Sequence, residues 1–213
     1  MRIQELFETD QSVTELSYTD PGIRKHLLAL KYKPAGQGGD QSTWLAPDGS
    51  ILKIFGTQRG QQGITGDHKM FIAWYKYANA HKTNPFMPKF FGWETFKVDH
   101  EDLDKNVVPH TYIQYKMERL SPITDQNTQN ILDLMDIQVE KGWPYARFIA
   151  LVDRTLGPKI TDTMEPLIKT LYPLVEELNR IAKKNGWGLD AHADNYMMRG
   201  NQLVIVDPWV ASD

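Results

Sequence analysis

Residues 188–209, GLDAHADNYMMRGNQLVIVDPW, gather three aspartates, a histidine and two asparagines into a short stretch with a run of aliphatic residues near its end. Carboxylate and amide oxygens are ligands of hard cations, and carboxylates and imidazoles accept and donate protons. Each acid alone also has an ordinary interpretation, in which Asp190 and Asp194 are loop residues and Asp207 caps a strand. The order and spacing of these residues must therefore decide between a functional and an ordinary interpretation. Both depend on the helices and strands that carry the residues.

A helix and a hairpin are predicted on either side of Asp190. Residues 162–186 place apolar side chains along one helical face, although Pro173 either kinks this helix or marks a late start. Residues 196–199 and 203–206 flank a Gly-Asn pair that is typical of a tight hairpin turn. A second amphipathic helix is predicted over 125–141.

The first half of the chain has the character of a sheet. Strands are predicted over 43–46 and 51–55, joined by a turn at Asp48-Gly49, and a glycine cluster precedes the first of them. One helix is predicted over 67–81, followed by two strands, KFFGWETFK and HTYIQYKMERL. The acidic segment 98–109 between these strands is interpreted as a solvated hairpin loop. The periodicity changes to helical near Ser121-Pro122, where we place the domain boundary.

Composition excludes several classes of function. The 213 residues carry a formal net charge of −3 with mixed signs, so no basic stripe predicts a nucleic-acid partner. The start of the chain is acidic where a signal peptide would be apolar, and no apolar run reaches the length of a membrane span. The absence of cysteine excludes disulfides, thiol catalysis and thiolate metal sites. We therefore expect a cytoplasmic protein with no membrane or nucleic-acid partner.

The motif Asp190-Ala-His-Ala-Asp-Asn195 resembles the Asp-x-x-x-x-Asn catalytic loop of protein-kinase-like phosphotransferases. The histidine two places after the aspartate is common in the atypical and aminoglycoside-phosphotransferase-like branch, which includes small kinases of phages and bacteria. A hairpin and then Asp207 follow, where this family has its magnesium-binding aspartate. The resemblance covers residues 32–209. It implies that Asp190 is catalytic at the acceptor hydroxyl, that Asn195 and Asp207 bind Mg²⁺, and that ATP is the donor.

His192 has two interpretations within this resemblance. A structural role, in which its hydrogen bonds buttress the loop, is favoured by the family pattern and by its place between the catalytic residues. The alternative is that it is a metal ligand.

Three further parts of the family pattern lie upstream. The cluster Gly36, Gly38 and Gly39 resembles the glycine-rich loop, whose backbone N–H groups approach phosphates. Lys53 interrupts an apolar strand where the family has the lysine that binds the α- and β-phosphates, although a lysine on an exposed strand face is the simpler alternative. The segment YKMERLSP resembles the adenine-binding hinge. Met117 is then the gatekeeper, and the Glu118 carbonyl and the Leu120 N–H face the adenine ring.

Several family features are missing. No glutamate lies between Gly56 and Glu94 to pair with Lys53, and the nearest carboxylate in sequence is that of Asp67. Gly188-Leu189 stands before Asp190 in place of an arginine that would sense a phosphorylated activation loop. Asp207 is followed by Pro208-Trp209 and not by Phe-Gly, and the six residues after it leave no room for an activation loop. The chain is accordingly either a minimal, constitutively competent kinase or a nucleotide-binding fold that has lost catalysis.

These observations predict an α+β, two-lobed protein-kinase-like fold. Residues 1–120 would form an antiparallel-sheet N-lobe with one helix, and residues 121–213 a reduced helical C-lobe that carries the catalytic and metal-binding loop. The leading function is transfer of phosphate from ATP·Mg²⁺ to Ser or Thr of a protein substrate, as in phage kinases that act in the host cytoplasm. The alternatives are a small-molecule kinase of the aminoglycoside type, or a pseudokinase that acts by binding a partner protein.

Overall fold

The computed structural model describes residues 20–38, 41–56, 66–101 and 107–211. Contacts within the chain divide it into two compact units: unit 1 is Met1–Lys69 with Lys89–Arg119, and unit 2 is Met70–Pro88 with Leu120–Asp213. Helix α3 (Gly66–Ala80), which the sequence analysis grouped with the strand-rich half, belongs to unit 2 from Met70 onward. None of the described helices is long and apolar enough to cross a membrane.

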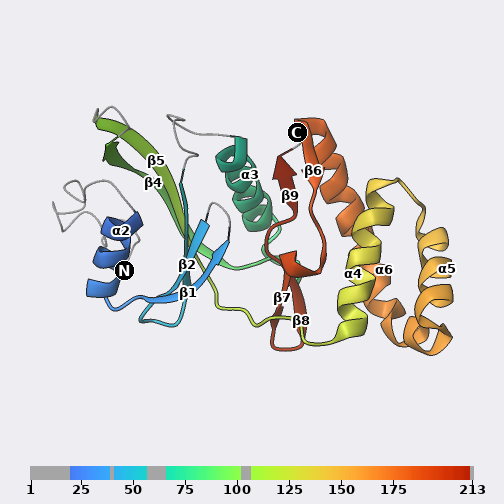
Figure 1. Cartoon of the computed structure of the whole chain (residues 1–213). Coiled ribbons are helices and arrows are strands. Elements are labelled where there is room, and N and C mark those ends of the chain that lie inside the picture. Colours follow the sequence, from blue (N-terminus) through green and yellow to red (C-terminus); the bar gives the residue numbers. More distant parts are fainter. Residues whose placement is uncertain (1–19, 39–40, 57–65, 102–106, 212–213) are drawn as a thin grey trace. The chain divides into compact units, whose positions relative to one another are not determined.

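Unit 1 is built on a five-stranded antiparallel sheet (Figure 1). Its strands are β1 (Lys33–Gly38), β2 (Gln41–Leu45), β3 (Ile51–Gly56), β4 (Phe90–Glu101) and β5 (Val107–Met117), in the order β1-β2-β3-β5-β4. Together with the helices of unit 2 this sheet gives the molecule an α+β composition, as the sequence predicts. The turn at Asp48-Gly49 joins β2 to β3, and Gly49 has the positive φ of 84° that such a turn requires.

The two faces of this sheet differ because side chains alternate along each strand. Leu52 and Ile54 of β3 are buried against one face, in a cluster that also includes Ile23 and Leu27 of helix α2 (Asp20–Ala29). Lys53 lies between them in the sequence and therefore points to the opposite face. The sheet register thus separates the apolar core under α2 from the face that carries the lysine.

The interpretation of segment 98–109 as a loop was wrong for residues 98–101 and 107–109, and residues 102–106 lie outside the described part of the chain. Strand β4 continues to Glu101 and β5 begins at Val107, and Asp99 pairs with Pro109 and His100 with Val108. Pairing of backbones in a two-stranded ribbon does not depend on apolar side chains. Charged residues are also common on edge strands such as β4, where they discourage pairing with other chains. The described charged residues of this segment, Asp99, His100 and Glu101, therefore belong to strand β4.

Unit 2 contains α3 and three further helices, α4 (Gln126–Glu140), α5 (Tyr145–Leu156) and α6 (Pro158–Asn185). The side chain of Asp125 caps α4 by accepting from the Thr128 N–H at 2.7 Å. Helix α5 was not predicted, although Phe148 and Val152, four residues apart, are its buried positions. Helix α6 begins at Pro158, earlier than the predicted residue 162, because proline fits the first turn of a helix.

Two small sheets complete unit 2. Strands β7 (Tyr196–Arg199) and β8 (Gln202–Ile205) form the predicted hairpin around Gly200, whose φ is 59°. Strands β6 (Trp187–Leu189) and β9 (Trp209–Ala211) also pair, which the sequence analysis did not predict. Between β6 and β7 lies the short 3-10 helix η2 (Ala193–Asn195). The β6–β9 pair brings the two ends of residues 189–209 together.

Candidate functional site

The backbone around residues 189–209 places Asp190, Asn195 and Asp207 in one neighbourhood of unit 2. Leu189 pairs with Trp209, and the Asp190 N–H donates to the Pro208 carbonyl at 2.8 Å. On the other side of Asp207, the Val206 N–H donates to the Asn195 carbonyl, also at 2.8 Å. Asp207 therefore lies between Val206, which is bonded to Asn195, and Pro208, which is bonded to Asp190.

The carboxylate of Asp190 is oriented by two side chains of its own loop. Its Oδ2 accepts from Asn195 Nδ2 at 2.9 Å, and its Oδ1 lies 3.1 Å from His192 Nε2. The Asn195 amide also donates to the Asp190 carbonyl at 2.7 Å. The Asp190 side chain is 33 % exposed. The carboxylate is thus held in one orientation and still has a face open to a substrate.

The tautomer of His192 follows from its partners. The Asp194 N–H, which can only donate, lies 3.3 Å from His192 Nδ1, so Nδ1 is the acceptor nitrogen. In the neutral ring Nε2 then carries the proton and donates to Asp190. The 3.3 Å approach of Asn195 Nδ2 to Nε2 is a contact and not a hydrogen bond, because both hydrogens of that amide already point to Asp190. These bonds support the structural interpretation of His192 over the metal-ligand one.

The donor set fits Mg²⁺ through oxygen ligands. With Asn195 Nδ2 used as a donor, Asn195 Oδ1 is the atom of that amide left to bind a cation, and Asp207 adds a carboxylate. The described residues contain no group of three or more His, Cys, Asp or Glu side chains arranged around a single ion. That finding is compatible with Mg²⁺, which commonly takes one or two protein ligands and completes its octahedron with phosphate oxygens and water.

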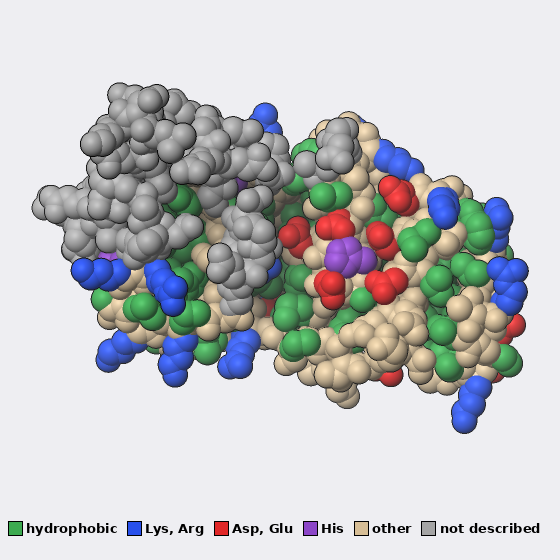
Figure 2. Space-filling view, in the orientation of Figure 1, with side chains coloured by type: hydrophobic (Ala, Val, Ile, Leu, Met, Phe, Trp, Pro, Cys, Tyr) green, Lys and Arg blue, Asp and Glu red, His purple; other side chains and the backbone are tan. Residues whose placement is uncertain are grey.

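Helix α4 contributes two aspartates to the same loop. Asp136 Oδ1 accepts from the Ala191 N–H and Asp133 Oδ1 from the Ala193 N–H, each at 2.8 Å. Burial raises the pKa of Asp136; the bond from Ala191 opposes that rise and the charge of Asp190 adds to it. Figure 2 shows acidic side chains gathered around a histidine on this face of unit 2. The surroundings of Asp190 are therefore acidic.

Two indoles fix the segment that carries Asp207. Trp74 of α3 donates through Nε1 to the Val206 carbonyl at 3.1 Å, and Trp209 donates to the Leu178 carbonyl of α6 at 3.0 Å. The two rings meet edge to face with centroids 5.8 Å apart. Both donors are buried, so the segment from Val206 to Trp209 is anchored to α3 and to α6.

In unit 1 the sheet register places Lys53 opposite Tyr115 of β5. Lys53 Nζ lies 5.9 Å from the centroid of the Tyr115 ring, which stacks on Phe55 at 5.5 Å. Lys53 is half-buried beside these aromatic rings, and this position differs from the bare strand face of the simpler alternative. Its role toward phosphates stays a prediction.

The residues of the predicted glycine loop and hinge lie in different places: some belong to strands, one is outside the described residues, and one belongs to unit 2. Gly36 and Gly38 lie within strand β1, where they pair with Thr43 and Gln41, and Gly39 lies outside the described residues. Met117 is the buried last residue of β5. Glu118 exchanges bonds with Lys89: its N–H donates to the Lys89 carbonyl at 2.9 Å, and its Oε1 accepts from the Lys89 N–H at 2.8 Å.

Leu120 belongs to unit 2 and is buried. The adenine contacts assigned to Glu118 and Leu120 involve backbone atoms, and they stay predictions.

Known proteins show little similarity to this chain. No protein-family model matches it, and no curated protein matches its sequence. Among solved structures, the streptomycin–ATP–APH(2")-IIa ternary complex is similar at a TM-score of 0.34 and 14 % identity, over 92 % of this chain and 73 % of that one. A likeness of this size carries no argument about function, which has to come from the geometry of the site itself.

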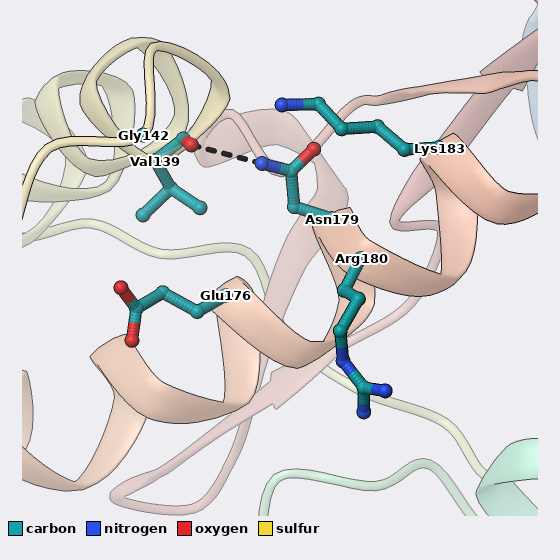
Figure 3. A pocket seen from close by; sticks show the side chains of 6 residues that line it. All are labelled: Val139, Gly142, Glu176, Asn179, Arg180 and Lys183. Carbon is teal, nitrogen blue, oxygen red and sulfur yellow. Dashed lines mark hydrogen bonds between the residues drawn. The ribbon is translucent and has the colours of Figure 1, made fainter.

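A separate depression of about 260 Å³ lies between the end of α4 and α6 (Figure 3). Two of its polar groups satisfy carbonyls at the end of α4: Asn179 Nδ2 donates to Val139 at 2.8 Å and Lys183 Nζ to Glu140 at 3.1 Å. These bonds cap a helix terminus. The depression therefore has a structural explanation.

Sequence reasoning missed Asp133, Asp136 and Trp74. The two aspartates interrupt the apolar run 131–137 of α4 at positions three apart, next to the buried Leu132 and Met135. Acids within such a run are the signal that was available in the sequence. Trp74 lies within the helix that was predicted over 67–81. Its indole N–H needed a buried acceptor, and nothing in the sequence indicated that this acceptor is Val206.

Proposed function

We propose that this protein transfers the γ-phosphoryl group of ATP·Mg²⁺ to a hydroxyl group. One observation carries the proposal. The carboxylate of Asp190 is oriented by His192 and Asn195, while backbone bonds of Val206 and Pro208, on either side of Asp207, hold the chain at that second aspartate next to the same loop. Phosphoryl transfer uses a positioned group at the acceptor hydroxyl and oxygen ligands for a cation, and these are the roles that we propose for Asp190 and for Asn195 with Asp207.

In the proposed reaction the acceptor oxygen forms a bond to the γ-phosphorus, and the bond from that phosphorus to the β,γ-bridging oxygen breaks. ADP leaves with the electron pair of the broken bond. Asp190 orients the acceptor hydroxyl and receives its proton, which then passes to solvent. Asn195 and Asp207 are proposed to hold the Mg²⁺, which screens the charge on the phosphates, and Lys53 is proposed to bind the α- and β-phosphates.

The acceptor is proposed to carry positive charge. Asp133, Asp136 and Asp194 lie around the Asp190 loop, and Asp194 is exposed over 96 % of its side chain. A negative field of this kind raises the local concentration of cationic substrates. A small alcohol with its own positive charge needs no contact beyond this loop to be attracted, whereas Ser or Thr needs basic neighbours in a protein segment. We therefore place the small cationic alcohol ahead of a protein acceptor.

Labelled ATP tests both the reaction and the acceptor. The protein is incubated with γ-labelled ATP, Mg²⁺ and a cell lysate that has been separated into macromolecular and small-molecule fractions, with EDTA as the control. Label in small cationic compounds supports the leading acceptor, and label in protein supports the Ser/Thr acceptor. Nucleotide binding without label in either fraction would refute the enzyme proposal and favour a pseudokinase that acts by binding a partner.

A further inference from the structure

The loop from Asp190 to Asn195 takes part of its backbone hydrogen bonding from a distant helix. The N–H groups of Asp190, Asp194 and Asn195 bond to Pro208 or to His192. The N–H groups of Ala191 and Ala193 instead bond to carboxylates of α4, 55 and 60 residues earlier in the chain. These two amides stand directly before and after His192.

The spacing on the two elements allows both bonds to form together. Asp133 and Asp136 are three residues apart on α4, so they share a face and are separated by about 4.5 Å along the helix axis. Ala191 and Ala193 are two residues apart, which in extended backbone corresponds to about 6.6 Å. Aspartate side chains are long enough to cover the difference, and both bonds are formed at 2.8 Å. Neither bond can shift without straining the other.

The consequence for Asp190 follows through His192. The ring of His192 donates to Asp190 Oδ1, so its position sets one of the two bonds that orient the carboxylate. The backbone of His192 is held on both sides by α4. Ala191 is fully buried and Asp136 half-buried, so water competes poorly for the Ala191 bond.

We propose that Asp136 and Asp133 are positioning residues for phosphoryl transfer, which act by accepting the Ala191 and Ala193 amides and thereby fixing the orientation of Asp190. This inference rests on the proposed function for its kinetic consequence, and on the geometry of α4 and the loop for its structural one. The positioning role belongs to the acceptor oxygen of each side chain, and it is separate from the attraction of a cationic acceptor, which depends on the charge.

Asparagine and alanine separate these two properties. Asp136→Asn keeps Oδ1 as an acceptor for the Ala191 N–H and removes the charge, whereas Asp136→Ala removes both. Asp133→Asn and Asp133→Ala form the second pair. Glu140→Ala, which alters an exposed acid at the end of the same helix, is the matched control.

The first measurement does not depend on activity. Amide hydrogen exchange is followed by NMR at Ala191 and Ala193 in the full chain. We expect Asp136→Ala to speed exchange at Ala191 by at least roughly tenfold, Asp133→Ala to do so at Ala193, and the asparagine variants and Glu140→Ala to stay within about threefold of the parent. Unchanged exchange in both alanine variants would overturn the positioning role, whatever the protein catalyses.

The second measurement is turnover of Mg²⁺·ATP, followed as labelled phosphate released to water or to the acceptor found in the lysate experiment. We expect Asp136→Ala to lower kcat by about 10- to 100-fold with the KM for ATP within about twofold, and Asp136→Asn to recover most of the loss. If Asp136→Asn lowers kcat as much as Asp136→Ala, or if Asp136→Ala changes only the KM of a cationic acceptor, the aspartates act by charge alone and the positioning proposal is wrong. A parent without turnover would refute the proposed function alone, because the exchange result still decides the geometry.

Discussion

The Asp190 loop of unit 2 and strand β3 of unit 1 position their functional side chains in different ways. Lys53 is placed by strand alternation, between Leu52 and Ile54, whose burial fixes which face the lysine takes. Asp190 has no such pattern around it. Its orientation depends on hydrogen bonds from within the loop, and the loop in turn depends on α3, α4 and β9.

This contrast shows where each position is vulnerable. A strand lysine keeps its place as long as the sheet forms, because its neighbours are fixed by many apolar contacts. A loop carboxylate is displaced by the loss of one acceptor, since each bond has a single partner. Variants at the loop should therefore change catalysis more than folding, and variants at the lysine should change ligand binding.

The largest effect is expected at Asp190. Asp190→Ala removes the proposed proton acceptor, and transfer should fall by on the order of 10²-fold or more, while affinity for Mg²⁺·ATP stays close to that of the parent. Calorimetric binding beside a labelled-phosphate assay measures both quantities. Asp162→Ala, which alters an exposed acid on α6, serves as control. Transfer at the parental rate would show that the loop has been misassigned.

Lys53→Ala should lower both nucleotide affinity and phosphoryl transfer, unlike Asp190→Ala. Its ammonium is proposed to bind phosphates in both the ground and the transition state, so affinity and transfer should fall together, each by roughly 10-fold. The same two assays apply, with Lys97→Ala on β4 as the exposed strand control. If Lys53→Ala lost transfer with unchanged affinity for Mg²⁺·ATP, it would behave like Asp190→Ala. The proposed difference between the lysine and the loop would then be wrong.

Trp74→Phe tests the support of the Asp207 segment. An aromatic ring remains, smaller than the indole, but the donor to the Val206 carbonyl is lost, and leaving that buried carbonyl without its partner should cost about 1 to 3 kcal/mol of the free energy of unfolding. Urea denaturation measures the change. Trp187→Phe, whose ring also packs on Trp209, is the matched control. Equal stability of the two variants would show that the indole bond has no such role.

A weaker effect is expected at the turn between β2 and β3. A hydrogen bond from Lys116 at 2.5 Å, with help from Ser50, lowers the pKa of Asp48 to about 2. A depressed pKa contributes stability above the unfolded-state value and loses it as pH falls, so the contribution should disappear between about pH 4 and pH 2. Asp48 is 57 % exposed, and the pair should be worth no more than about 1 kcal/mol.

Asp48→Asn should therefore flatten this part of the pH dependence of unfolding. An identical acid limb in parent and variant would contradict the assignment.

The sequence predicted most of the elements because hydrophobic periodicity is local. The α+β composition, the β2–β3 turn at Gly49 and the hairpin at Gly200 follow from short patterns. The two ends of segment 98–109 were misjudged because charge was taken as a sign of a solvated loop, although backbone pairing tolerates charge on an edge strand.

The candidate site was predictable only as a motif. Asp190, Asn195 and Asp207 stand at a recognisable spacing. Asp133, Asp136 and Trp74 are joined to backbone groups beside these residues, at Ala193, Ala191 and Val206, by single hydrogen bonds over 55 to 132 residues of chain, and no local pattern encodes such a partnership.

Replacing Mg²⁺ by Mn²⁺ tests whether residues 190–207 bind a metal–nucleotide complex, on which the proposed function depends. Paramagnetic broadening of amide NMR signals is measured with Mn²⁺·ATP, with Mn²⁺ alone and with Asp207→Asn. We expect the strongest broadening at Asn195 and Asp207, dependent on ATP and lost in the variant. Broadening centred elsewhere, or equally strong without ATP, would contradict the proposed site.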